Sequence, residues 1–242
     1  MSYPFVLGCL VSDLSKGLVT VFLTQYFAFK TWNWNEWKDF RLDTLRNVVS
    51  FLISSTVACF VGSAANALSM FYSMDQTSPF LVYFFRSIAS NGVIMVCLTP
   101  FLMSLRYLRF KSFKKLPKLQ TALIALLLLL IPIPLYFLTI IQDASLPFTS
   151  IMGLNLCFPI VLLIFTYSNE IVGTFSVLFV SLLSNLFIAL YKMDISLIPF
   201  DQNLSAVTLF QVVLSGTALI LYGIIQERNM VFLTVSFGYL SS

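Results

Sequence analysis

Charged and amide side chains interrupt two segments of the chain that are otherwise strongly apolar. Asp13 and Lys16 lie in the first segment, three residues apart and therefore on one face of a helix. Arg86 and Asn91 lie in the second segment, where the pair Thr99–Pro100 follows them. In hydrocarbon a charged side chain costs about 2.5–3.5 kcal/mol on insertion scales, so we expect these residues to face a pocket, a partner or water. They form the candidate site for binding a ligand or for coupling helix movements.

The sequence allows two pairings of these charges. If both segments cross a membrane in the same direction, Asp13 and Arg86 lie roughly 14 and 11 Å from the outer ends of their helices, at about 1.5 Å rise per residue. An ion pair between the two helices is therefore one interpretation. The other is that Asp13 pairs with Lys16 on its own helix, while Arg86 extends to the outer interface.

The composition is typical of an integral membrane protein. Of the 242 residues, 59% are hydrophobic and 10% are charged, whereas soluble domains have about 25% charged residues. The chain contains no histidine, which excludes imidazole metal sites and histidine-based acid–base catalysis. Because no phosphate-binding loop, nucleophile elbow or metalloprotease motif is present, we expect neither an enzyme nor a bound cofactor or metal. The net charge of +4 does not indicate nucleic-acid binding.

Long apolar runs predict an all-α fold, a polytopic transmembrane helix bundle with about seven spans of about 20 residues. The runs cover residues 4–28, 44–72, 79–105, 119–141, 148–167, 171–191 and 205–226. Basic residues concentrate at 29–46 and 106–118, and such loops stay in the cytoplasm. We therefore expect the amino terminus outside and the carboxyl terminus in the cytoplasm. The predicted domains are a membrane domain over 1–228 and a short cytoplasmic tail over 229–242.

Amide, small and proline residues within these runs predict how the helices pack. Five amides are expected to form hydrogen bonds between helices: Asn66, Asn91, Asn155, Asn185 and Gln211. Ala58 and Gly62 make a pair of small residues one turn apart, which allows close helix approach. Four prolines are expected to interrupt and kink their helices: Pro100, Pro132, Pro134 and Pro159.

The segment "RSIASNGVIMVCLTPFLMSL" (86–105) resembles the signature span of the first membrane-associated sensor family, the MASE type-one domain of bacterial signalling proteins. Members of that family have a Gly-Asp or Ser-Glu pair, a glycine three residues later, and an ending in Thr-Pro or Val-Pro. The pair falls here on Ser90–Asn91, the glycine on Ile94 and the ending on Thr99–Pro100. Asn91 thus stands in place of the family's acid, without its charge.

Three further stretches are similar to the same family in the same order: 43–68, 156–183 and 209–229. The resemblance covers about residues 40–228. It implies a sensory input domain of a bacterial inner membrane, with 79–105 as its coupling element. The signal would pass to a cytoplasmic kinase, diguanylate cyclase or cyclic-di-GMP phosphodiesterase outside this chain. Because family members usually have about eight spans, the resemblance also implies that an initial span is missing here.

Two other functions stay open. A small transporter or exporter component would line a substrate path with its intramembrane charges, and a degenerate membrane scaffold would need no ligand. The expected partners are the lipid bilayer, an unidentified small ligand, and a signalling partner or output domain at the cytoplasmic end. A homo-oligomer stays open as well.

Overall fold

The chain is helical throughout the part that the structure describes. In this computed structural model, the described residues are 3–29, 40–73, 80–105, 118–135, 148–191 and 200–240. Apart from short turns and unassigned residues, they form helices, and no strand occurs among them. The predicted all-α class is therefore confirmed. The chain divides into two compact units, Met1–Val96 and Cys97–Ser242.

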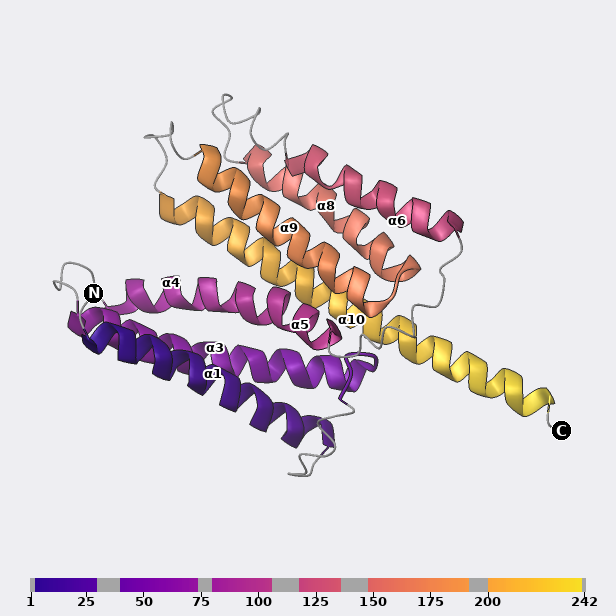
Figure 1. Cartoon of the computed structure of the whole chain (residues 1–242), viewed down its shortest axis with the longest axis horizontal. Helices are drawn as coiled ribbons and strands as arrows, with labels where there is room; N and C mark the ends of the chain where they lie inside the picture. Colours follow the sequence, from indigo (N-terminus) through magenta and orange to yellow (C-terminus); the bar gives the residue numbers. More distant parts are fainter. Residues whose placement is uncertain are drawn as a thin grey trace. The chain divides into compact units, whose positions relative to one another are not determined.

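The first unit contains the helices α1 (Tyr3–Phe29), α3 (Leu45–Ser73) and α4 (Phe80–Val93). α1 packs along α3, and α3 packs against α4 (Figure 1). Early residues of α1 bond to late residues of α3, so the two helices are antiparallel. One core cluster of this unit consists of Ala58, Cys59, Met95 and Val96.

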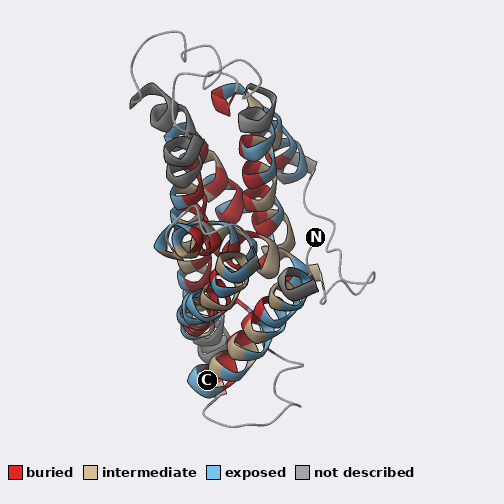
Figure 2. Cartoon of the chain, turned by 90° about the vertical axis from the view of Figure 1, so that its left-hand side faces the viewer, coloured by how far each residue is buried: buried red, intermediate tan, exposed pale blue. Residues whose placement is uncertain are grey.

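The π-helix η1 (Ile94–Leu98) contains the boundary between the two units. The second unit continues with α5 (Thr99–Leu105), α6 (Lys118–Leu130), α8 (Phe148–Tyr167), α9 (Glu170–Tyr191) and α10 (Phe200–Leu240). α8 packs against α6, α9 and α10, and α9 also contacts α5 and α10. In both units the buried residues lie on the helix sides that face a neighbouring helix (Figure 2).

Four helical stretches are long and apolar enough to cross a membrane: Val6–Phe29, Leu45–Tyr72, Phe80–Leu105 and Val207–Phe232. Shorter apolar helices cover Thr121–Leu135, Asn155–Tyr167 and Glu170–Leu186. These helices extend no more than one residue beyond the apolar runs of the sequence, except that α10 begins at Phe200 and continues to Leu240, through most of the predicted tail. Residues 30–39 and 106–117 carry most of the basic residues that orient the chain, and they lie outside the described residues.

The prolines interrupt some helices and not others. Proline has no N–H to donate, and its ring crowds the carbonyl four residues earlier. Directly before Pro100 the helix widens to the π form at Ile94–Leu98, and α6 ends at Leu130, two residues before Pro132. Pro159 lies inside α8, which is assigned as one helix. The predicted interruption is therefore confirmed near Pro100 and Pro132. Pro134 and Pro159 both lie within helical residues, and a kink at either stays a prediction.

Candidate functional site

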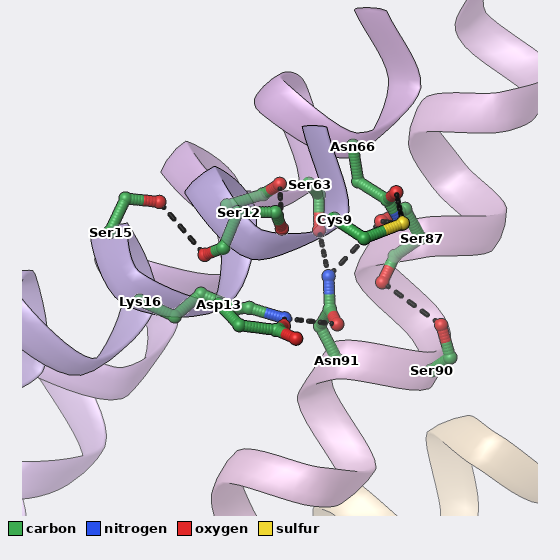
Figure 3. A network of polar contacts seen from close by, with 11 residues as sticks. Cys9, Ser12, Asp13, Ser15, Lys16, Ser63, Asn66, Ser87, Ser90 and Asn91 are labelled. Atoms are coloured by element: carbon green, nitrogen blue, oxygen red, sulfur yellow. Dashed lines mark hydrogen bonds and ion pairs between the residues drawn. The ribbon is translucent and has the colours of Figure 1, made fainter. Parts of the chain in front are cut away.

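A lysine is buried where the described helices of the first unit meet. Lys16 is 8% exposed, and its Nζ lies 2.6 Å from Asp13 Oδ1 and 2.8 Å from Asn91 Oδ1 (Figure 3). The Asp13 side chain is 71% exposed, so the ion pair joins an exposed carboxylate on the outer side of α1 to a buried ammonium group. A buried ammonium group requires partners of this kind, because it has lost its water.

Asn91 joins all three helices. Its Oδ1 accepts the hydrogen bond from Lys16 of α1, while its Nδ2 donates to Ser63 Oγ of α3 and to Ser87 Oγ of α4, both at 3.0 Å. Because the lysine ammonium group can only donate, this contact fixes which end of the amide faces it. Asn91 is 6% exposed and uses both of its N–H donors.

Asn66 extends these contacts along α3. Its Nδ2 donates to Ser87 Oγ at 3.0 Å, and its Oδ1 accepts from the Cys9 thiol at 3.6 Å. Ser12 Oγ of α1 donates to the carbonyl of Gly62 at 2.7 Å. We call this set the Lys16 network, and its members are Cys9, Ser12, Asp13, Lys16, Ser63, Asn66, Ser87 and Asn91 (Figure 3).

Gly62 lets α1 approach α3 closely enough to build this network. A Cβ atom at this position would clash with Lys16 Cγ, and it would lie 2.6 Å from Lys16 Cδ and 3.1 Å from the carbonyl oxygen of Ser12. The stem of the lysine therefore fills the space that a larger residue at position 62 would need. The close approach predicted from Ala58 and Gly62 is confirmed at Gly62, and Ala58 is completely buried.

The structure brings together three of the predicted site residues. Asp13 pairs with Lys16 on its own helix, which was one of the two interpretations, and Asn91 completes the group. Arg86 belongs to α4, but its side chain lies outside the described residues, so the pair Asp13–Arg86 stays a prediction. Thr99–Pro100 begin α5 in the second unit, on the helical run that also contains Asn91.

Ser12, Ser63 and Ser87 were not predicted as site residues. The sequence did contain a signal for two of these serines. Ser12 precedes Lys16 by one helical turn, and Ser87 precedes Asn91 by one turn. However, serine hydroxyls in helices commonly bond to their own backbone. Ser54, which donates to the carbonyl of Ser50 at 2.6 Å, is an example. Spacing alone therefore does not single out the serines of the site.

A second buried amide joins helices of the second unit. The Nε2 atom of Gln211 in α10 lies 2.6 Å from Ser184 Oγ, 3.3 Å from the Ser181 carbonyl oxygen and 3.5 Å from Asn185 Oδ1, all on α9. The interhelical hydrogen bonds predicted from amides are confirmed for Asn66, Asn91, Asn185 and Gln211. The prediction is not confirmed for Asn155, which is exposed and has no hydrogen-bond partner among the described residues.

Comparisons with known proteins add no candidate for the function. No family model matches the chain, and no curated protein or solved structure does. In the described part of the chain, no group of three or more His, Cys, Asp or Glu side chains is placed to hold a metal ion. The Lys16 network is therefore the arrangement from which a function has to be argued.

Proposed function

We propose that the chain is an integral membrane sensory domain of the bacterial inner membrane. In this proposal it crosses the bilayer seven times, with the amino terminus outside, and belongs with the MASE type-one sensors that residues 86–105 resemble. The observation that carries the proposal is the buried Lys16, hydrogen-bonded at 2.8 Å to Asn91, the residue that stands where the family has its acid. Ionisable residues inside membrane helices are rare and mark functional sites by default.

The Lys16 network offers a way to detect a polar ligand. Asp13 is exposed and Asn91 is buried, and both bind the same ammonium group. A ligand that reaches Asp13 and accepts hydrogen bonds from Lys16 would compete with Asn91, and so release α1 from α4. A ligand shifts an equilibrium between two helix arrangements only by the difference in its affinity for them. Competition for Lys16 supplies such a difference.

The signal would leave the network along one helical run and would reach the cytoplasm through another helix. Asn91 lies on the helical run Phe80–Leu105, which passes through the π-helical residues Ile94–Leu98. Such π-helical turns are frequent at functional sites. α10 has 41 residues, about twice the number needed to cross a bilayer. Its residues 228–232 are exposed, and this part of the helix would carry the rearrangement to a kinase or a cyclic-di-GMP enzyme.

A reporter fusion tests the sensor function. The chain is fused after α10 to a diguanylate cyclase, and cyclic-di-GMP is measured in cells together with the amount of fusion in the membrane. Asn91→Asp gives Lys16 a second charged partner and Asn91→Leu removes its partner on α4, so the two variants should shift the output in opposite directions. Thr56→Val is the matched control, because Thr56 is exposed on α3 and donates to its own helix at Leu52. Equal output from all four proteins at equal levels would contradict the proposal.

A transporter or exporter component is the second candidate, and one observation favours it. Buried polar residues recur every four positions along α1, at Ser12, Lys16, Thr20 and Thr24. A substrate path across a bilayer needs such a row of polar groups. Proton flux into liposomes that contain the purified chain, measured with an internal pH dye, separates the two functions. Flux that Lys16→Met abolishes would favour transport, whereas a responsive reporter without flux would favour sensing.

A further inference from the structure

Four buried polar side-chain atoms of the first unit have no hydrogen-bond partner among the described residues. The atoms are Thr20 Oγ1, Thr24 Oγ1 and Gln25 Nε2 of α1, and Ser55 Oγ of α3. Each of these residues is at most 5% exposed. We call Thr20, Thr24 and Ser55 the unpaired cluster.

The helix register places these residues in one part of the α1–α3 interface. Thr20 and Thr24 are one turn apart on the same face of α1, whereas Gln25 lies about 140° around the helix from Thr20 and is not part of the cluster. The bonds from Cys9 and Ser12 to α3 fix the antiparallel register, which places Ser55 level with Thr20. The unpaired cluster therefore begins one turn beyond Lys16 and continues along the same buried face.

Unpaired polar atoms are costly in this setting. A buried donor or acceptor without a partner loses its hydration and gains nothing in return, and lipid tails cannot supply the missing bond. Two other threonines show the usual arrangement in a helix. Thr56 and Thr166 each donate to a carbonyl of their own helix at 2.8 Å. Because Thr20 and Thr24 do not, their hydroxyls are available to an occupant.

The chemistry of the unpaired cluster favours a neutral occupant that both donates and accepts hydrogen bonds. The three hydroxyls of the cluster can do either. A cation would be opposed by Lys16, one turn from Thr20. An anion would need an uncompensated positive charge, but Lys16 already binds Asp13 at 2.6 Å. Water meets these requirements, since a buried water forms about three hydrogen bonds to groups that are otherwise unsatisfied.

We propose that the α1–α3 interface around the unpaired cluster is a buried hydration site, in which ordered water molecules bridge Thr20, Thr24 and Ser55. These waters extend the Lys16 network along α1 and continue its polar contacts over two further helical turns. The site does not depend on the sensor function, because it follows from unpaired atoms outside the Lys16 network.

Water-edited solid-state NMR of the chain in lipid bilayers tests this site directly. With carbon-13-labelled threonine, polarisation should pass from water to Thr20 and Thr24 several-fold faster than to Thr56. Thr56 is the matched control, because it is exposed on the apolar helix α3 and its hydroxyl is bonded within that helix. The variants Thr20→Val and Thr24→Val assign the two signals.

The same variants give a second, independent measurement. Valine keeps the shape of threonine without the hydroxyl, so Thr24→Val breaks the bonds to bridging water and should lower the midpoint of thermal unfolding by about 2–4 °C. If no water were bound, valine would remove an unpaired hydroxyl and raise the midpoint. A raised midpoint in both variants, or transfer to Thr20 and Thr24 no faster than to Thr56, would overturn the proposal.

Discussion

The two parts of the α1–α3 interface differ in how their polar side chains are paired. In the Lys16 network, amides, hydroxyls and one ammonium group bond to one another across three helices. In the unpaired cluster, which begins one turn further along the same face of α1, three hydroxyl groups have no partner among the described residues. The contribution of α4 distinguishes the two parts, because it supplies Ser87 and Asn91 to the network.

Side-chain reach explains why the network depends on its amides. Asparagine carries two donors and an acceptor, so Asn91 can bond to α1 and α3 while it remains on α4. Serine and threonine have one hydroxyl close to the backbone, and in helices this group usually bonds to a carbonyl three or four residues earlier. Gln211 joins α10 to α9 in the second unit in the same way. The positions of the amides therefore decide where apolar helices are joined.

Removal of the Asn91 amide should have the largest effect, because it makes the network resemble the unpaired cluster. Asn91→Leu deletes the bond to the charged Lys16 and leaves Ser63 and Ser87 with fewer partners. Since hydrogen bonds to charged groups contribute about 1.5–3 kcal/mol, we expect a loss of about 3 kcal/mol in the free energy of unfolding. The measurement is thermal unfolding in detergent, followed with a dye that reacts with the buried free cysteines.

The matched control for this variant is Asn91→Asp. A carboxylate still accepts from Lys16, and the hydroxyls of Ser63 and Ser87 can turn to donate to it. We therefore expect Asn91→Asp to cost less than about 1 kcal/mol. Equal losses in the two variants would mean that the volume of residue 91, rather than its hydrogen bonds, holds the helices together.

A methyl group at Gly62 should have the next largest effect, because it pushes α1 away from the network. In Gly62→Ala the new Cβ atom would have to displace the stem of Lys16, whose Cδ would be only 2.6 Å away, and overpacking of this kind costs about 1–3 kcal/mol. Gly17→Ala is the matched control, since a Cβ there meets nothing within 4 Å. That variant should be neutral or stabilising by up to about 1 kcal/mol, through helix propensity. If Gly62→Ala unfolded at the same temperature as Gly17→Ala, the close approach would not support the network.

The positions of the helices and the joining amides could be predicted from the sequence, but the choice of partners could not. Apolar runs determine where helices form, and an asparagine inside such a run has to find a bond, so Asn66 and Asn91 were predictable. That Lys16 reaches Asn91, 75 residues away, depends on the rotation of α1 about its axis and on the space at Gly62. Depth and charge sign, which suggested the pair Asp13–Arg86, contain no information about this rotation.

Two features of the backbone and packing could also not be predicted from the sequence. The proline at position 100 predicted an interruption, but not that the helix would widen to the π form at Ile94–Leu98. The unpaired cluster could not be foreseen either. Threonine hydroxyls can bond to their own helix, as Thr56 does, and only the packed structure shows that those of Thr20 and Thr24 do not.

Lys16→Met should have a smaller effect than Asn91→Leu. Methionine keeps most of the apolar stem that packs on Gly62, and the charge that is left behind belongs to Asp13, which is 71% exposed. Removal of one partner from a buried ion pair is severe chiefly when the remaining charge is buried. We therefore expect a loss of about 1–2 kcal/mol, mostly from the bond to Asn91, in the same unfolding assay. A loss as large as that of Asn91→Leu would show that the ammonium group, and not the amide, is the centre of the network.

Asp13→Asn should have the smallest effect of the four. The asparagine oxygen can still accept from Lys16 Nζ, so only the ionic part of a contact with a largely exposed partner is lost. Exposed ion pairs contribute about 0–1 kcal/mol, and we expect a shift within that range in the unfolding assay. A double-mutant cycle with Lys16→Met should give a coupling energy of the same size. A coupling well above about 1 kcal/mol would mean that Asp13 is covered by another protein surface in the membrane, and the Lys16 network would then extend beyond the three helices that build it here.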